Sequence, residues 1–183
     1  MISFLKSANR LADFPTDKKE IVFVGRSNAG KSTLINALYK KGLAYTGKTP
    51  GKTKMINFFD NETYYVVDVP GYGFANRNMD EQILFGQMME EYFSRKQIAL
   101  CVMITDARLG LTNDDKDMMD FLIDNHINFI IVANKIDKLS NNELNNNKRK
   151  YFNEYKNIYY VSAEKRIGLE SIKEKINSVI KVS

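Results

Sequence analysis

The stretch that decides the fold is Gly25-Arg26-Ser27-Asn28-Ala29-Gly30-Lys31-Ser32, an octet of the form Gly-x-x-x-x-Gly-Lys-Ser. It follows an apolar run, residues 21–24, and precedes a segment of helical character that starts at Thr33. This setting predicts a phosphate-binding loop, because the backbone N–H groups of such a loop turn inward onto a polyphosphate. Lys31 can then reach the outer phosphates and the Ser32 hydroxyl can ligate Mg²⁺, while the positive end of the helix dipole adds to the same anion site.

A second motif, Asn134-Lys135-Ile136-Asp137, directly follows the apolar run 129–133. Guanine presents two adjacent donors, the ring N1–H and the N2 amine, and one carboxylate accepts from both, whereas adenine has no such pair. We therefore predict that Asp137 reads the base and that Lys135 lays its aliphatic stem along it. Taken alone, the motif is also typical of a polar loop that caps a helix. Its position after a buried-type strand, downstream of a phosphate loop, favours a guanine site.

Two weaker motifs complete the set. Asp68-Val69-Pro70-Gly71 ends a strand and would bring a carboxylate near the metal and a glycine N–H near a γ-phosphate. Ser162-Ala163-Glu164 follows the strand 157–161 and would set backbone donors against the base carbonyl. Either motif is common by chance. Four motifs in this chain order, each at a strand end, predict a guanine-nucleotide site.

Composition is that of one globular domain. The chain has 183 residues, of which 44% are hydrophobic and 27% charged, so it can bury a substantial core. The single cysteine, Cys101, lies in an apolar run and is expected to be a buried side chain, and the single histidine, His126, is expected to be structural or exposed. We see no signal peptide, no apolar span and no prenylation motif, so we expect a cytoplasmic protein that makes no membrane contact.

Apolar periodicity predicts an alternating α/β chain. A mostly parallel sheet is expected, with residues 55–60 and 63–68 as an antiparallel hairpin at one edge. The Asn-rich stretch 141–147 is interpreted as a solvated segment or a loosely formed helix start. Strands are expected near 20–25, 55–60, 63–68, 97–105, 127–133 and 157–161, and helices near 31–41, 80–95, 112–125, 141–155 and 168–181.

The motifs resemble those of the translation-factor-related P-loop GTPases, in the Era/EngA-like branch. Finer features resemble the EngB/YsxC family of ribosome-biogenesis GTPases over essentially the whole chain. These features are Thr49-Pro50-Gly51-Lys52-Thr53, Ile56-Asn57-Phe58-Phe59, Asp68-Val69-Pro70-Gly71-Tyr72-Gly73-Phe74-Ala75, and an N-terminal arm with Phe4, Ser7-Ala8 and Pro15.

The resemblance implies a Ras-like G domain over residues 1–183, with a short arm (1–18), six mostly parallel strands with one antiparallel edge strand, and about five helices. It implies GTP hydrolysis to GDP with Mg²⁺, in which Lys31, Thr53 and Gly71 are catalytic, Ser32 and Thr53 ligate the metal, and Asp68 supports it. Thr46 and Thr49 remain alternatives to Thr53. The predicted nucleotide site comprises residues 25–33, Gly51, Lys52, Thr53, Asp68, Val69, Pro70, Gly71, Asn134, Lys135, Asp137, Ser162, Ala163 and Glu164.

Two positions bear on the hydrolysis rate. Tyr72 stands where Ras-like enzymes place a water-orienting glutamine, so we expect slow unaided turnover, and Tyr72 is also consistent with simple packing. Asn28 is interpreted either as a ligand for an activating K⁺ or as a residue that holds the loop backbone. The segment 42–54 is expected to close onto the γ-phosphate and to open after hydrolysis.

Charge bears on the partner. The net charge of +5 permits nucleic-acid contact without requiring it, and a solvated basic surface explains it equally well. The resemblance implies a monomer that binds the large ribosomal subunit or its precursor, with its RNA and proteins, and a link to cell division and septation. A GTP-hydrolysing switch and a GTP-dependent binding module with incidental hydrolysis share every motif, whereas an ATP-using kinase or motor conflicts with Asp137. The basic residues gather in three groups: Lys40, Lys41, Lys48, Lys52 and Lys54; Arg77; and Lys148, Arg149 and Lys150.

Overall fold

The computed structural model describes residues 2–39, 42–44, 55–73, 79–152 and 155–181. Within these residues, strands form one sheet in the order β1-β3-β4-β2-β5-β6-β7. β3 runs antiparallel to both of its neighbours, and every other pair is parallel. The strands are β1 (Ser3–Ala8), β2 (Lys19–Gly25), β3 (Ile56–Asp60), β4 (Tyr64–Asp68), β5 (Ile98–Asp106), β6 (Phe129–Asn134) and β7 (Ile158–Tyr160).

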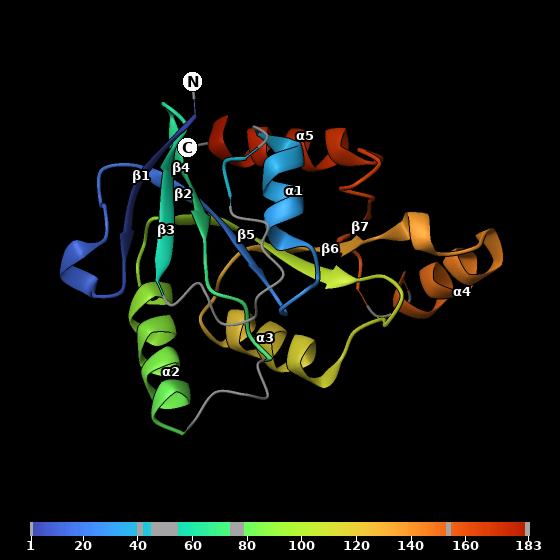
Figure 1. Ribbon diagram of the computed structural model, residues 1–183, viewed down its shortest axis with the longest axis horizontal. Helices are drawn as coiled ribbons and strands as arrows, with labels where there is room; N and C mark the ends of the chain where they lie inside the picture. The colour runs from blue at the N-terminus through green and yellow to red at the C-terminus, as the bar shows by residue number, and fades with distance from the viewer. Residues whose placement is uncertain (1, 40–41, 45–54, 74–78, 153–154, 182–183) are drawn as a thin grey trace.

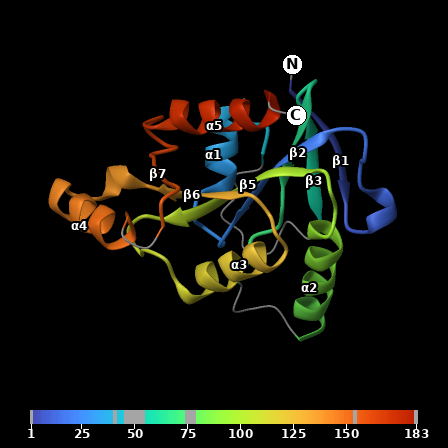
Figure 2. The ribbon, with the colours of Figure 1, turned by 180° about the vertical axis from the view of Figure 1, so that it is seen from behind.

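Helices cover both faces of the sheet. Figure 1 shows α1 and α5 on one face and α2 and α3 on the other, and Figure 2 shows the same layers from behind. α4 lies outward from β7 in both views. The helices are α1 (Lys31–Leu38), α2 (Met79–Phe93), α3 (Asn113–Asp124), α4 (Asn141–Phe152) and α5 (Leu169–Lys181), with short 3₁₀ helices η1 (Leu11–Asp13) and η2 (Ile136–Lys138).

The central strand β2 explains the two layers. Ile21 and Phe23 pack into the core cluster that contains the buried residues of α1 and α5, whereas Val22 and Val24 pack into the cluster of α2 and α3. Successive side chains of a strand point to opposite faces, so a continuous apolar run is what a strand covered on both sides requires. The carboxyl ends of the parallel strands therefore meet at one edge of the sheet, where the predicted motifs follow them.

Every strand and helix expected from periodicity is present, and the structure adds one strand. β1 was assigned to the N-terminal arm, but it pairs with β3 and makes the sheet seven-stranded rather than six-stranded. The hairpin β3–β4 is therefore covered on one side, and β1 forms the edge. Most β1 side chains are exposed, and this is why no buried-strand pattern indicated it.

The Asn-rich stretch 141–147 forms the start of α4, which confirms the helix expected near 141–155, and most of its side chains are exposed. α4 begins after Ser140, whose hydroxyl donates to Glu143 Oε2 at 2.7 Å, while the Glu143 N–H donates back to Ser140 Oγ at 3.3 Å. This reciprocal cap satisfies N–H groups that a helix start otherwise leaves unpaired. As expected, Cys101 is buried and His126 is exposed. No helix among the described residues has the length and apolarity needed to cross a bilayer.

Candidate nucleotide-binding site

The octet forms the loop between β2 and α1, as predicted. Gly30 has φ 98° and precedes the first helical residue, Lys31. A Cβ on Gly30 would lie 2.3 Å from Asn134 Nδ2, so the position requires glycine for both its backbone angle and its close packing. Gly25 is equally crowded, because a Cβ there would lie 2.8 Å from the Ile104 carbonyl oxygen. The loop is therefore shaped by its own backbone and by the ends of β5 and β6.

Lys31 and Asp68 form an ion pair at the carboxyl end of β4. The Asp68 side chain is buried, with 5% of its surface exposed, and that of Lys31 is 11% exposed. The pair places the Lys31 ammonium, which could bind phosphate, beside the Asp68 carboxylate. Ser32, with its hydroxyl, is the next residue in the chain after Lys31. Mg²⁺ takes oxygen ligands and is commonly held by one or two protein oxygens together with substrate phosphates and water, so these donors fit the ion.

The Asp-x-x-Gly segment is joined to the phosphate loop along its backbone. The Val69 N–H donates to the Phe23 carbonyl at 3.2 Å, and the Ser27 N–H donates to the Tyr72 carbonyl at 3.1 Å. Gly71 lies so close that a Cβ would sit 3.3 Å from the Gly25 carbonyl oxygen. The segment is therefore fastened by backbone contacts to the loop that is predicted to hold the phosphates.

Tyr72 points into the core rather than toward the phosphates. Its side chain is buried in the cluster beneath α2 and α3, and its hydroxyl donates to Asp115 Oδ1 at 2.9 Å. Burial and the neighbouring Asp115 carboxylate raise the pKa of Tyr72 far above its ordinary value. The packing interpretation of Tyr72 is confirmed, and its hydroxyl is already committed to Asp115.

Asn134 joins three motifs. Its Nδ2 donates to the Ala29 carbonyl at 3.1 Å, and its Oδ1 accepts from the Ala163 N–H at 3.0 Å. The residue is buried, so both contacts replace water on polar atoms that would otherwise be unsatisfied. The phosphate loop, the Asn-Lys-x-Asp motif and the Ser-Ala-Glu motif are thus brought to one edge of the sheet, although the Ala163 N–H faces Asn134 here.

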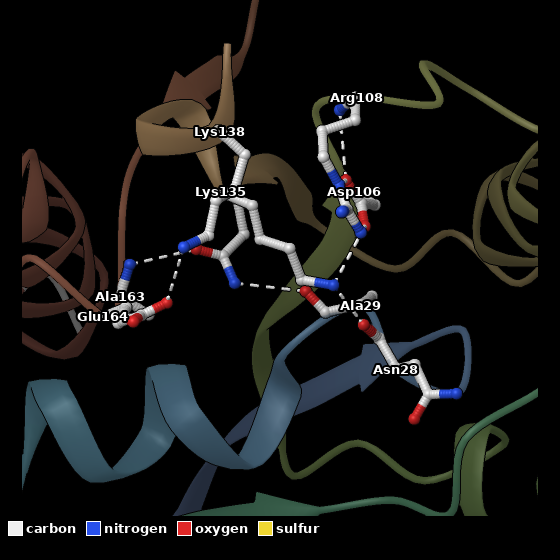
Figure 3. A network of polar contacts seen from close by, with 9 residues as sticks. Asn28, Ala29, Asp106, Arg108, Lys135, Lys138, Ala163 and Glu164 are labelled. Atoms are coloured by element: carbon white, nitrogen blue, oxygen red, sulfur yellow. Dashed lines mark hydrogen bonds and ion pairs between the residues drawn. The ribbon is translucent and has the colours of Figure 1, made fainter.

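Asp137, the predicted base reader, is held ionised. Ser162 Oγ donates to its Oδ1 at 2.6 Å, and Lys138 Nζ lies 3.2 Å from its Oδ2. The hydrogen bond from Ser162 outweighs partial burial, and with Lys138 it lowers the pKa of Asp137 below its ordinary value. Lys138 also pairs with Glu164, which is 63% exposed, at 3.4 Å (Figure 3). A charged carboxylate is the form that a base reader needs.

Two further residues belong to the site and were not predicted. Asp106, at the end of β5, accepts from Lys135 Nζ at 2.9 Å and from Arg108 Nη2 at 2.6 Å (Figure 3). Burial tends to raise the pKa of Asp106, but the hydrogen bonds from Arg108 and Lys135 outweigh it and lower the pKa to about 2. The sequence signal for Asp106 was its place at the end of an apolar strand, beside the strands that carry the other motifs.

Asn28 is exposed in the phosphate loop and has φ 68°. Its backbone carbonyl accepts from Lys135 Nζ at 2.5 Å, and its side chain points away from Lys135 in Figure 3. Asparagine tolerates this left-handed backbone better than most residues, and this gives it a structural reason to stand here. Among the described residues, no hydrogen bond joins its side-chain amide to the loop backbone.

The remaining predicted residues within the described part of the chain are partly buried and partly exposed. Val69 and Pro70 are buried, Thr33 is exposed on α1, and Arg26 Nε lies 3.9 Å from Asp114 Oδ2. Gly51, Lys52, Thr53, Thr46 and Thr49 lie outside the described residues, as do Lys40, Lys41, Lys48, Lys54 and Arg77, so the roles given to them stay predictions.

Comparisons with known proteins agree with this geometry. Residues 20–135 match the family described as 50S ribosome-binding GTPase. A probable GTP-binding protein EngB of Mycoplasmopsis synoviae (strain 53) is 43% identical over 185 residues, which cover 97% of this chain and 99% of that protein. A probable GTP-binding protein EngB of Kosmotoga olearia is 40% identical over 179 residues, covering 93% and 94%. The crystal structure of a probable GTP-binding protein engB is similar with a TM-score of 0.72 at 28% identity, covering 90% of this chain and 100% of that one.

Proposed function

The chain belongs to the EngB family of GTP-binding proteins and is a GTPase, and from this premise we propose that it is a switch acting in assembly of the large ribosomal subunit. The observation that supports a switch built on one nucleotide is the Asn134 side chain, which joins the phosphate loop to the Ser-Ala-Glu motif. A nucleotide seated there would touch the ends of β2, β4, β6 and β7 together. Its γ-phosphate would be sensed by the segments that follow β4 and α1.

In this proposal each predicted site residue has a separate role in binding the nucleotide. Lys31 would bind the outer phosphates, and Ser32 with Asp68 would hold Mg²⁺. When bound, the ion would neutralise charge that develops on the transferred phosphoryl group. Thr53 and the Gly71 N–H complete the grip on the γ-phosphate, so that loss of this phosphate releases both segments. Asp137 selects guanine.

The ribosomal role is supported by the name of the matching family, 50S ribosome-binding GTPase, and by charge. α4 carries three basic residues, Lys148, Arg149 and Lys150, all exposed, in a chain of net charge +5. Ribosomal RNA is a polyanion, and its binding to such surfaces releases counterions and weakens steeply with salt. We place the protein in the cytoplasm, acting as a monomer.

Co-sedimentation with ribosomal subunits tests the proposal. We expect the protein to pellet with the large subunit or its precursor in a non-hydrolysable GTP analogue, and less in GDP, with binding that falls as salt rises. Lys31→Ala, which loses the phosphate contact, is the control that should not distinguish the two nucleotides. Equal pelleting of the parent in both would contradict nucleotide control.

A second candidate is a GTP-dependent binding module in which hydrolysis is incidental. The buried Tyr72 favours it, because a side chain bonded to Asp115 does not orient a water as glutamine does. Turnover measured with and without purified subunits separates the two. The switch requires acceleration by subunits, whereas the binding module requires the same slow rate in both.

We also propose that K⁺ accelerates hydrolysis through Asn28. Its exposed side chain extends from the loop that faces the phosphates, where a cation would offset charge in the transition state. Turnover in K⁺ should exceed turnover in Na⁺ at equal ionic strength, and Asn28→Ala should abolish the difference. A parent enzyme indifferent to the cation would leave Asn28 with its backbone role alone.

A further inference from the structure

A chain of charges lies beneath Lys135, between β5 and the phosphate loop. Asp106 accepts through both oxygens: Oδ1 from Arg108 Nε at 2.9 Å and from the Arg108 N–H at 3.1 Å, and Oδ2 from Lys135 Nζ at 2.9 Å (Figure 3). Its side chain is 8% exposed, whereas that of Arg108 is 46% exposed. A buried carboxylate is thus held between a half-exposed guanidinium and the ammonium of Lys135, whose side chain is 25% exposed.

The ammonium of Lys135 is held at two points. Besides Asp106, it donates to the Asn28 carbonyl at 2.5 Å, while the Lys135 backbone sits at φ 70° at the end of β6. The stem therefore crosses from the end of β6 to the phosphate loop with both ends fixed. A free lysine side chain samples many rotamers, and ordering it on binding costs affinity. A stem ordered beforehand offers a flat apolar surface without that cost.

We propose that Asp106 is a positioning residue for guanine-nucleotide binding, which acts by holding Lys135 as a bridge from the base site to the phosphate loop, with Arg108 fixing Asp106. The proposal rests on the assignment of Lys135 to the base. Asp106 itself touches no nucleotide in this scheme.

The competing explanation is local. The Arg108 N–H and side chain both return to Asp106, so the carboxylate also closes a turn after β5. If Asp106 were purely structural, replacing it would lower the stability of the protein and would weaken nucleotide binding whether or not Lys135 were present. The two explanations therefore differ in whether the effect of Asp106 depends on Lys135.

A double-mutant cycle decides between them. The dissociation constant of a fluorescent GDP derivative with Mg²⁺ is measured for the parent, Asp106→Asn, Lys135→Met and the double variant. Loss of one charge-assisted hydrogen bond should weaken binding by roughly tenfold in Asp106→Asn, mainly through faster dissociation. In the Lys135→Met background the same change should cause no further weakening. An equal factor in both backgrounds would overturn the proposal.

Three more variants complete the design. Glu170→Gln removes an exposed ion pair on α5, the 2.8 Å contact with Lys173, and should bind GDP as the parent does. Arg108→Ala leaves the carboxylate of Asp106 in place but removes the guanidinium that fixes it, so we expect GDP to bind about threefold more weakly. If Asp106→Asn does not fold, Arg108→Ala takes its place in the cycle. Parental GDP binding by Arg108→Ala would then count against the proposal. Arg108→Lys keeps the charge and should recover part of the loss. Parental binding by Lys135→Met would instead refute the assignment of Lys135, whereas parental binding by Asp106→Asn alone would refute only this inference.

Discussion

At the scale of single residues, the site depends on close packing as much as on charge. Gly30 and Asn134 show this: the glycine has no Cβ because the asparagine amide occupies that space, and the same amide reaches the Ala29 carbonyl at 3.1 Å. A larger residue at position 30 would not fit against Asn134, and a shorter side chain at position 134 would not reach the Ala29 carbonyl. The loop 25–32 is therefore preorganised by Asn134 of the Asn-Lys-x-Asp motif.

Gly30→Ala should abolish measurable nucleotide binding and destabilise the fold. The new Cβ would lie 2.3 Å from Asn134 Nδ2, at φ 98°, where an L side chain is strained. Gly86→Ala is the matched control, because nothing lies within 4 Å of a Cβ built there, and in the helix α2 it should add about 0.5–1 kcal/mol of stability. Nucleotide titration and urea unfolding measure both. Parental GDP binding by Gly30→Ala would show that the loop adapts.

Asp137→Asn should weaken GTP binding by about 1.5–3 kcal/mol, because one charge-assisted hydrogen bond to guanine is lost. The variant should gain affinity for xanthine nucleotides, whose extra carbonyl accepts from the new amide. Asp13→Asn, which changes only an exposed pair with Arg10, serves as the control. Competition of GTP and xanthosine triphosphate for one fluorescent nucleotide gives both numbers, and an unchanged preference would remove Asp137 as the base reader.

How far the sequence reaches differs among residues. The four motifs could be predicted because each has a fixed spacing and lies at a strand end. Asp106 and Arg108 could not, because their importance depends on which side chain Lys135 meets, a contact between strands that is far apart in the chain. Tyr72 lies between these cases: the sequence is consistent with a packing role, which the buried side chain and its bond to Asp115 confirm, and the slow turnover expected from an aromatic at this position stays a prediction.

At the scale of elements, the N-terminal arm, β2 and α2 are joined by one buried group of charges. Glu20 on β2 is fully buried, accepts from the Tyr92 hydroxyl at 2.5 Å and pairs with Arg95 Nη2 at 2.8 Å. Arg95 also lies over the Phe14 ring, 5.2 Å from its centroid, and donates to the Pro15 carbonyl. The chain leading into β2 is thereby tied to the end of α2.

Arg95→Ala should destabilise the protein by about 3–5 kcal/mol at neutral pH, because Glu20 is left buried and unpaired. Burial already raises the pKa of Glu20 above 4.5 while Tyr92 and Arg95 lower it, so losing Arg95 raises this pKa further. A folded-state pKa above the unfolded value means that the folded chain holds the proton more tightly, so stability falls as pH rises from 4.5 through the folded value.

Urea unfolding at pH 5 and pH 7.5 checks this sign. The loss caused by Arg95→Ala should be larger at pH 7.5 than at pH 5, and adding Glu20→Gln should remove the difference. A loss that is the same at both values would mean that Glu20 does not titrate in this window.

The helices and strands differ in how clearly the apolar pattern of the sequence predicts them. The buried strands and α5 were predicted because their apolar residues repeat with a clear period, whereas β1 was not, since most of its side chains are exposed. A helix was expected near 141–155, although most of the described side chains of α4 are exposed as well. α4 is stabilised at its start by the Ser140–Glu143 cap rather than by an apolar face. Exposed elements of this kind are determined by hydrogen bonds that hydropathy does not record.

At the scale of the whole molecule, β1 forms one edge of the sheet and bears on where the domain begins. It pairs with β3 from Ser3 opposite Asp60 to Ala8 opposite Ile56, and Ser7 Oγ donates to Asn57 Oδ1 at 2.6 Å. Ala8 is buried in the core cluster of α2 and α3, whereas Ile2 belongs to the cluster of α1 and α5. We propose that the G domain includes this arm, so that Ser3–Ala8 completes the sheet rather than extending from it.

Deleting residues 1–8 should therefore destabilise the protein by a few kcal/mol, since Ile2 alone contributes roughly 1.5–3 kcal/mol when buried. It should also make the protein associate, because β3 would become an edge with a row of unpaired N–H and C=O groups. Ser7→Ala, which removes only the bond to Asn57, should cost about 0.5–1.5 kcal/mol and leave the association state of the protein unchanged. Chemical unfolding combined with light scattering over a range of concentrations tests both effects. A truncated chain with the stability and the association state of the parent would show that the arm is an appendage to a domain that starts at β2.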